Sequence, residues 1–441
     1  MKRLLSLLLC VVLALFCAPT AQAAGVSITL TASEYALHYA FDAGAQDPFV
    51  ILEYTTPAEK GWMMLYSEDG HFEGDVSLAY SGAGGKTSVA LTSARTTGSI
   101  GKASTTLPKA ADYQKPTGKS NAKVTDFMLT ETPEGFHYAF NAIGTDYMLL
   151  YWRSKEQTVT QPVYPDENGH YEGDVVSELT FARTQFTVQV KSGSGSMKKE
   201  ATVRKGYQAP EAPQRQEGRL SGVTVCIDAG HQENGRFVNE PIGPGLTGST
   251  SGKGGMAQGT KTNRRESIVC LEIGMLLRDE LLRQGANVIM TREDQTTFHT
   301  NIERCEIAEA GGAQIMLRLH CNNSSNRSKR GIQVYGPLNS DYAKAVADAD
   351  TYREMGQKLL DAMKTRVGMT LANSTGMVRL NDNYVGNNWA KMMCFLVEMG
   401  YLSNPAEEYL LVTPVYQQWL AEGMADGVYE IAVARGWVQA Q

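Results

Sequence analysis

Two histidines and two glutamates, placed where apolar segments end or a helix begins, carry the chemistry of this sequence. His231 ends the apolar run VCIDAGH, His320 ends IMLRLH, and Glu398 follows MCFLV. Glu266 stands near the start of a helix expected over 264–284. Two imidazoles and a carboxylate form a ligand set that catalytic zinc uses, with a fourth position open to water, and a spare carboxylate then serves as general base. The residue types therefore predict a metal site with a base beside it.

Each of these residues also has an ordinary structural interpretation. A histidine at a strand end is commonly a hydrogen-bonded structural residue, and an acid in the first turn of a helix is favoured by the helix dipole. Glu398 is harder to explain in this way, because a carboxylate after a buried apolar run costs free energy unless it has a cation or a task. The sequence contains no compact HExxH motif, so spacing alone leaves both interpretations open.

The segments that must position these residues alternate between strands and helices from Ser221 onward. Apolar runs of strand length alternate with runs of helical periodicity. Alternating β and α units predict a mainly parallel sheet flanked by helices, and ligands bind such sheets beyond the carboxyl ends of the strands. The expected strands are 223–227, 287–291, 315–319 and 393–397, and the expected helices are 264–284, 301–310, 342–366 and two that begin at Asn404 and Thr413.

The N-terminal half contains an internal duplication. The sequence HYAF at 38–41 returns at 137–140, and GHFEGDV at 70–76 returns as GHYEGDV at 169–175. Both pairs are offset by 99 residues, and short alternating runs separated by turn residues surround them. This pattern predicts two tandem β-sandwich-like repeats. Each copy contributes two histidines that have no partner at metal-ligand spacing, so we expect them to be structural.

The N-terminus has the features of a secretory signal peptide over 1–23. Lys2 and Arg3 precede an apolar stretch that is short for a membrane span, and a small-residue cleavage site follows at 21–23. No later segment is apolar enough to cross a membrane. We therefore expect a signal peptide at 1–23, repeats at 24–110 and 123–207, and a catalytic domain at 221–437, with the mature protein exported.

Charge and cysteine content exclude several other classes. The net charge of −6 gives no support to a nucleic-acid partner, which favours a basic surface. Two of the seven cysteines lie in the signal peptide, and the remaining five are odd in number and form no CxxC pair. Neither a disulfide framework nor a zinc–cysteine site is indicated. No feature of the sequence specifies an oligomeric state.

The region from Ser221 to about Gly436 resembles the zinc-dependent N-acetylmuramoyl-L-alanine amidases, a family that cleaves peptidoglycan. Four blocks carry the resemblance in order, namely VCIDAGHQ, the glutamate of RES at 265–267, LRLHCNNS and FLVEMGYLSNPAEE. The resemblance covers about half of the chain and leaves the N-terminal repeats outside. Ala229 stands where the family usually has proline, and Cys321 replaces a small residue. We expect neither departure to remove a ligand.

The resemblance also implies residue roles and an activity. It implies Zn²⁺ as cofactor, with His231, Glu266 and His320 as ligands and Glu398 as the catalytic residue. The expected reaction is cleavage of the amide between N-acetylmuramic acid and L-alanine of the stem peptide, by a zinc-bound water and a glutamate general base. The expected partner is peptidoglycan, and the expected location is extracellular or cell-wall associated.

Substrate-binding residues are less defined by the sequence. The glycine-rich stretch 232–260 directly follows His231 and is expected to border the substrate. Five arginines could hold carboxylates of the stem peptide or could be solvated surface charge, namely Arg264, Arg265, Arg327, Arg330 and Arg379. Two alternative functions remain, a non-catalytic wall-binding or signalling protein with an amidase-like domain, and another zinc peptidase acting on wall peptides. The usual His-x-x-Glu pair of such peptidases is absent at His231.

Overall fold

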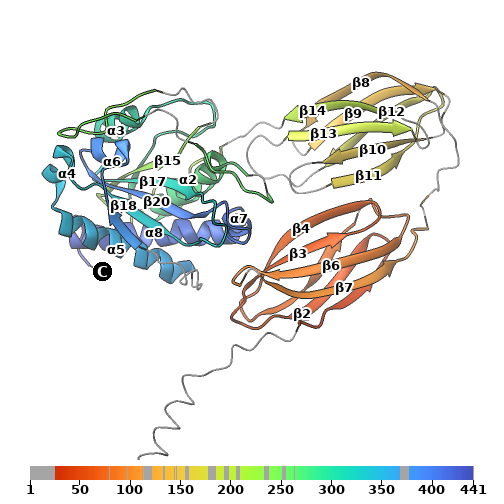
Figure 1. Ribbon diagram of the computed structural model, residues 1–441, viewed down its shortest axis with the longest axis horizontal. Coiled ribbons are helices and arrows are strands. Elements are labelled where there is room, and N and C mark those ends of the chain that lie inside the picture. The colour runs from red at the N-terminus through yellow and green to blue at the C-terminus, as the bar shows by residue number, and fades with distance from the viewer. Residues whose placement is uncertain are drawn as a thin grey trace, which may run out of the picture. The chain divides into compact units, whose positions relative to one another are not determined.

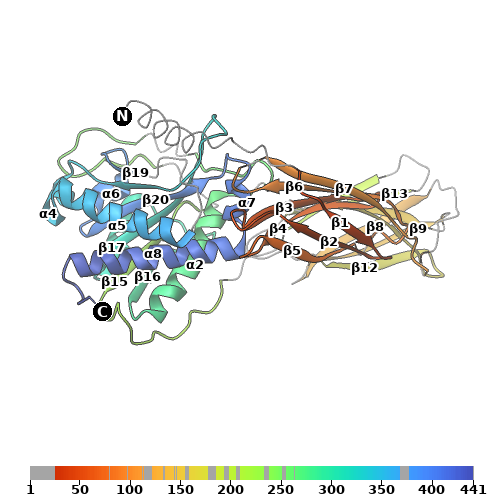
Figure 2. The same ribbon diagram turned by 90° about the horizontal axis from the view of Figure 1, so that it is seen from below.

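A computed structural model describes most of residues 25–440 (Figures 1 and 2). The chain separates into two compact units, residues 1–114 and 115–441. The signal peptide expected at 1–23 lies outside the described residues. None of the described helices is long and apolar enough to cross a membrane. Residues not described within this range are 79, 97, 112, 114–121, 133–134, 144, 146, 154–157, 177–184, 193–197, 205–208, 233–237, 251–254, 263 and 368–376.

The first unit contains two antiparallel sheets that share one core. Alternate residues of its strands are buried, because successive side chains of a strand point to opposite faces. Leu37 and Phe41 of one sheet join Leu52 and Val89 of the other in a single buried cluster. One sheet has the order β1 (Thr29–Ala32), β2 (Ala36–Asp42), β5 (His71–Ser77), and the other has the order β4 (Glu59–Tyr66), β3 (Phe49–Thr55), β6 (Gly85–Ser93), β7 (Ser99–Leu107).

The second unit begins with the same arrangement of strands. Phe140 stacks on Tyr171 with ring centroids 4.6 Å apart, as Phe41 stacks on Phe72 at 4.9 Å in the first unit. The duplicated sequence therefore forms duplicated strand pairs with matching core contacts. The strands are β8 (Lys123–Thr132), β9 (Gly135–Ile143) and β12 (His170–Val176) in one sheet, and β11 (Thr158–Val163), β10 (Met148–Arg153), β13 (Gln185–Ser192) and β14 (Lys198–Arg204) in the other.

A six-stranded mixed sheet forms the centre of the C-terminal part. Its order is β16 (Asn287–Met290), β15 (Thr224–Ala229), β17 (Ile315–Asn322), β20 (Met393–Tyr401), β18 (Gln333–Gly336), β19 (Met377–Leu380). The first four strands pair in parallel, whereas β18 runs antiparallel to β20 and parallel to β19. The sequence did not predict β18 and β19. Because β18 is reversed, its first residue lies at the edge where β20 ends.

Helices cover both faces of this sheet, so its central strands are apolar on both sides. Cys226 and Met316 face α3, whereas Ile227 and Leu319 lie under Gly274 of α2. Figures 1 and 2 both show α5 and α8 side by side. The helices are α2 (Glu266–Arg283), α3 (Asn301–Ala310), α4 (Asp341–Val346), α5 (Ala349–Val367), α6 (Val385–Trp389), α7 (Glu407–Leu411) and α8 (Pro414–Ala434).

The single helix expected over 342–366 is wrong. The chain leaves the helix at Ala347, which has extended backbone angles, and α5 then begins at Ala349. Asp348 supplies the reason, because its side chain accepts a hydrogen bond from Thr351 N–H at 2.8 Å. An aspartate that satisfies a free N–H of a helix start favours a new helix over continuation of the preceding one.

Candidate metal centre

The end of β15 brings His231 close to β17 through its backbone. A Cβ on Gly230 would lie 2.4 Å from Leu319 O and 2.6 Å from His320 Cε1, so only glycine allows this approach. His231 itself has φ 59°, in the left-handed region that a non-glycine residue rarely adopts. The two imidazole rings consequently lie 4.9 Å apart between centroids. Backbone strain of this kind concentrates at functional sites, which directs attention to the His231 ring.

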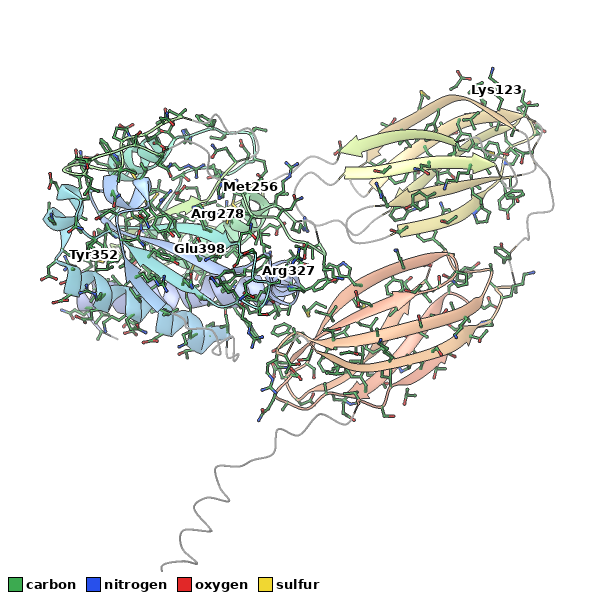
Figure 3. All side chains as sticks on the ribbon, in the orientation of Figure 1. Lys123, Met256, Arg278, Arg327, Tyr352 and Glu398 are labelled. Atoms are coloured by element: carbon green, nitrogen blue, oxygen red, sulfur yellow. The ribbon has the colours of Figure 1, made fainter. Side chains whose placement is uncertain are left out.

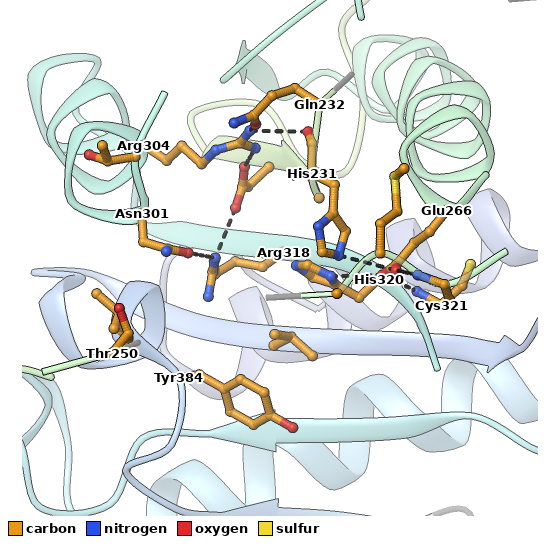
Figure 4. A pocket seen from close by; sticks show the side chains of 18 of the residues that line it. His231, Gln232, Thr250, Glu266, Asn301, Arg304, Arg318, His320, Cys321 and Tyr384 are labelled. Atoms are coloured by element: carbon orange, nitrogen blue, oxygen red, sulfur yellow. Dashed lines mark hydrogen bonds and ion pairs between the residues drawn. The ribbon is translucent and has the colours of Figure 1, made fainter. Parts of the chain in front are cut away.

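Glu266, the first residue of α2, lies between the two imidazoles (Figure 4). Its Oε1 is 2.9 Å from His320 Nδ1, and its Oε2 is 3.1 Å from His231 Nε2. One ligand atom from each residue lies within 4.8 Å of the others, and no second His, Cys, Asp or Glu group of this kind occurs among the described residues. His320 Nε2 is buried without a hydrogen-bond partner there. The structure therefore brings the three residues named by the sequence into one cluster that fits a small cation.

The local environment favours the metal-binding protonation states of Glu266 and His320. Burial alone would raise the pKa of Glu266, but hydrogen bonds from His231 and His320 hold it below its usual range. Backbone N–H groups of Cys321 and Ala257 also donate to the Glu266 carboxylate, at 3.0 and 2.8 Å. Burial lowers the pKa of His320. An ionised carboxylate and a neutral imidazole are the forms that bind metals.

Glu398, labelled in Figure 3, lies on β20 next to the strand that carries His320, and it lines the same cavity as the cluster. It is the register partner of His320 across the parallel pair of β17 and β20. Its Oε2 is buried and has no hydrogen-bond partner among the described residues. Burial, together with the negative charge of Glu266, raises the pKa of Glu398 to about 8. A carboxyl group with such a shift, in a cavity, is a candidate for proton transfer.

A buried ion network fixes the strand that carries His231. Asp228 is fully buried and pairs with Arg304 and Arg318, while Thr291 donates to it at 2.8 Å. Burial would raise the pKa of Asp228, but the two guanidinium charges hold it well below its usual range. Residue spacing along the sequence did not predict this network. Arg318, a charge within the apolar run IMLRLH, is the signal that could have indicated it.

Two buried arginines hold the backbone just before and at His231. Arg292 donates to the carbonyls of Ala229 and Gly230, at 2.7 and 2.9 Å, and also to Ser267 O in the first turn of α2 at 2.7 Å. Arg304 donates to the His231 carbonyl at 3.1 Å. These bonds tie the strand end to the helix that supplies Glu266, and they support the unusual backbone angle of His231.

A cavity of about 890 Å³ opens over the cluster and is lined by His231, Glu266, His320 and Glu398. The stretch 232–260, expected to border the substrate, contributes Gln232, Val238, Glu240, Thr250 and 255–257 to its wall. Residues 233–237 and 251–254 of that stretch lie outside the described residues. Cys321 also reaches the wall, but its thiol is hydrogen-bonded to Cys270 and burial raises its pKa, so it stays protonated.

The five candidate arginines occupy different places. Arg330 and Arg379 line a second cavity of about 510 Å³, which shares two asparagines with the first. Arg264 is buried with its guanidinium 3.8 Å from Glu272, and Arg265 precedes α2 as its N-cap residue. Arg327 is exposed (Figure 3) and is absent from the described lining of both cavities.

The repeat histidines, expected to be structural, pair with side chains on neighbouring strands. Antiparallel pairing of β2 and β5 places His38 opposite Asp75 and Asp42 opposite His71. His38 Nδ1 lies 3.1 Å from Asp75, and His71 Nδ1 lies 2.7 Å from Asp42. Glu73 lies near both rings. The register of the strands brings these partners together although they are far apart in the sequence. The spacing of residues along the sequence does not predict such pairs.

Comparison with known proteins assigns the C-terminal half to a family. Residues 225–430 match the family model described as N-acetylmuramoyl-L-alanine amidase. A germination-specific N-acetylmuramoyl-L-alanine amidase of Bacillus subtilis strain 168 is 26% identical over 231 residues, which are 49% of this chain and 83% of that protein. A probable cell wall amidase, LytH, of Staphylococcus aureus is 27% identical over 218 residues, 48% of this chain and 60% of that protein. A crystal structure of an N-acetylmuramoyl-L-alanine amidase from Clostridium difficile 630 aligns with 22% identity and a TM-score of 0.39, covering 49% of this chain and all of that one. Residues 225–430 of this chain therefore form a domain of the N-acetylmuramoyl-L-alanine amidase family.

Proposed function

We propose that this chain is an exported peptidoglycan hydrolase that cleaves the amide between N-acetylmuramic acid and L-alanine of the stem peptide. One observation carries the proposal. His231, Glu266 and His320 converge in a cavity beside Glu398, within a domain of the amidase family. The relatives named above are amidases, and one is named as acting at the cell wall. An amide in the wall polymer is therefore the substrate that best suits this site.

Zinc is the metal that we propose for the cluster. Two imidazoles and one carboxylate match a zinc donor set, and the buried, unpartnered His320 Nε2 is a free ligand atom. Bound zinc would lower the pKa of a coordinated water toward about 7, polarise the scissile carbonyl and, by its charge, favour the ionised form of Glu398. The backbone N–H groups of Ala257 and Cys321 donate to the Glu266 carboxylate and fix the orientation of its ligand oxygens.

Glu398 is the general base in this proposal. Its carboxylate lies in the cavity next to His320 and has an oxygen without a hydrogen-bond partner in the described part of the chain. It accepts the proton of the attacking water and returns it to the nitrogen of the departing L-alanine. A carboxyl group whose pKa lies near neutral is suited to both steps. Proton transfer of this kind is typically worth about 10² to 10⁴ in rate.

The repeats have a separate role in the proposal. Residues 24–110 and 123–207 are two β-sandwich-like modules, and 221–437 is the catalytic domain that follows them. The described repeat residues supply no member of the metal cluster or of its cavity. We assign them to holding or positioning the enzyme on its substrate, after the signal peptide at 1–23 directs export.

Digestion of purified peptidoglycan, followed by mass spectrometry of the soluble products, tests the function. The expected products are free stem peptides that begin with L-alanine and glycan strands that keep the lactyl group. Shortened peptides still attached to muramic acid would instead identify a peptidase. Retention of the protein on the wall without any released peptide would identify a binding protein. The Glu398→Gln variant is the matched control for contaminating hydrolases.

A further inference from the structure

The second cavity is lined by three cationic residues and by neutral polar groups. Lys329 and Arg330 come from the loop after β17, and Arg379 comes from β19. No acidic residue belongs to its lining among the described residues. Such a wall favours an anion, and arginine in particular suits a carboxylate, which it can bind through two parallel hydrogen bonds.

This basic cavity adjoins the metal centre. Asn322 and Asn323 line both cavities, so the two are neighbours. Asn322 follows His320 by two residues along β17, which corresponds to about 7 Å of strand. Gln333, also in the basic cavity, is the register partner of Glu398 across β18 and β20. The basic cavity is therefore lined from both strands that flank β20, from β17 through Asn322 and from β18 through Gln333.

Several acceptor oxygens of its wall already have donors. Gln333 Oε1 accepts hydrogen bonds from Asn322 Nδ2 at 3.1 Å and from the Tyr335 hydroxyl at 2.7 Å. Asn322 Oδ1 accepts from Asn323 N–H at 2.8 Å. Glu407 accepts from the backbone N–H groups of Gly331 and Tyr401 and is not part of the lining. The oxygens that would repel an anion are thus engaged within the protein.

We propose that this cavity binds the carboxylate carried by the stem-peptide residue that follows L-alanine. The inference rests on the proposed function, which places the departing L-alanine nitrogen near Glu398. An extended dipeptide spans about 7 Å, so a stem peptide with its L-alanine at the metal centre can extend toward the adjoining basic cavity. A glutamate in that position carries the charge, whereas its amidated form does not. Lys329 and Arg379 thereby make the enzyme prefer stems with a free carboxylate.

Binding of two dipeptide probes tests the assignment without requiring catalysis. The probes are L-alanyl-D-glutamic acid γ-methylamide, which keeps one free α-carboxylate, and L-alanyl-D-isoglutamine γ-methylamide, which has none on that residue, and their Kd values are measured by calorimetry with the full mature chain. The double variant Lys329→Gln, Arg379→Gln should reduce the preference for the acidic probe by about tenfold, since each exposed pair is worth up to about fivefold. Affinity for the amidated probe should not change. Arg327→Gln, in the same loop but outside the lining, should preserve the preference.

An unchanged preference in the double variant, or an equal loss of affinity for both probes, would overturn the assignment. A parallel measurement of kcat/KM on acidic and amidated muropeptides separates this outcome from failure of the proposed function. If both muropeptides are cleaved equally well, the carboxylate site is wrong and the amidase function stands. If the chain binds the acidic probe with the expected preference but releases no stem peptide, the cavity assignment stands and the function is wrong.

Discussion

Histidine–glutamate–histidine arrangements occur in both repeats and in the amidase domain, and among the described residues only the last has the geometry of a metal centre. In the first repeat, Glu73 lies 3.4 Å from His38 and 3.6 Å from His71. In the amidase domain, Glu266 lies 2.9 and 3.1 Å from its two histidines. The Glu73 side chain is 59% exposed and that of Glu266 is 4% exposed. The residue types agree, so burial and convergence make the difference.

The two regions also differ in what holds the carboxylate. Glu266 accepts two backbone N–H bonds at the start of a helix, and buried arginines fix the chain next to His231. Glu73 lies on the exposed face of a strand among other charged side chains. Exposed ion pairs contribute only about 0–1 kcal/mol, because water screens them and the side chains lose entropy. We therefore expect the exposed arrangement to bind protons and the buried one to bind a metal.

Removing the central carboxylate in each region gives the largest expected contrast. Glu266→Gln should abolish stoichiometric zinc binding and activity, because a neutral amide replaces a charged ligand. Glu73→Gln removes the equivalent group from the exposed arrangement and should leave both unchanged. Elemental analysis of the purified variants measures zinc per chain. Zinc that persists in Glu266→Gln, or disappears in Glu73→Gln, would invert the comparison.

Glu398→Gln tests whether Glu398 acts as the general base, in contrast to Glu266, which is proposed as a metal ligand. The variant keeps the shape of the side chain but removes the proton acceptor, so turnover should fall by at least about 10². Zinc content and thermal unfolding should match those of the unchanged protein. Release of stem peptides and zinc per chain are measured on the same samples. Loss of zinc in this variant would mean that ligand and base have been exchanged.

Arg292→Met tests the backbone support of the buried arrangement. The substitution removes the side-chain donor of the Gly230 carbonyl and one of the donors of the Ala229 and Ser267 carbonyls, which keep their bonds from Arg304 and Gln295. Changes in groups that orient metal ligands typically weaken metal affinity by about 10- to 100-fold, and we expect that range here. Competition with a chromogenic chelator gives the zinc affinity independently of activity. The control is Arg283→Met, which changes a partly exposed arginine in the last turn of α2. This variant should leave the zinc affinity unchanged. An unchanged zinc affinity in Arg292→Met would show that the strand end holds His231 without this arginine.

Much of the catalytic domain was readable from the sequence because its signals are local. The helix expected over 301–310 is α3, and the apolar runs before His320 and Glu398 are β17 and β20. The four-residue strands β18 and β19 were not predicted, whereas β16, of the same length, was expected at 287–291 because it directly follows the turn that ends α2.

The interactions that were not predicted join residues far apart in the chain. Asp228 meets Arg318 at a separation of 90 residues, and His71 meets Asp42 at a separation of 29. Strand order and register decide such pairs, and the spacing of residue types along one sequence does not contain them. For the metal cluster, the sequence supplied the residue types, and the structure added the approach of Gly230 to β17 that brings the two rings together.

The smallest expected effect concerns the exposed arrangement and uses a difference between the two repeats. Asp42 of the first repeat corresponds to Asn141 of the second. The Asp42 carboxylate oxygen lies 2.7 Å from His71 Nδ1, and the Asn141 amide oxygen lies 2.7 Å from His170 Nδ1. Hydrogen bonds to Asp42 and then to Glu73 raise the pKa of His71 above 6.5. A raised histidine pKa stabilises the folded repeat below the unfolded value, and this contribution is lost as pH rises through the folded value.

Asp42→Asn gives the first repeat the residue that the second repeat already has, and should therefore lower the pKa of His71 toward its ordinary value. The reason is that an amide oxygen favours the imidazolium less than a carboxylate does. An NMR titration of the His71 ring, together with thermal unfolding below pH 6 and above pH 8, measures both the proton and its linked stability. The difference in stability between the two pH ranges should become smaller in the variant. Asp75→Asn is the control, since its carboxylate lies against His38. If His71 titrates at the same pH in Asp42→Asn, its proton is held by Glu73 instead. If zinc content changes as well, the exposed arrangement would share the function of the buried one, and burial would not be what separates them.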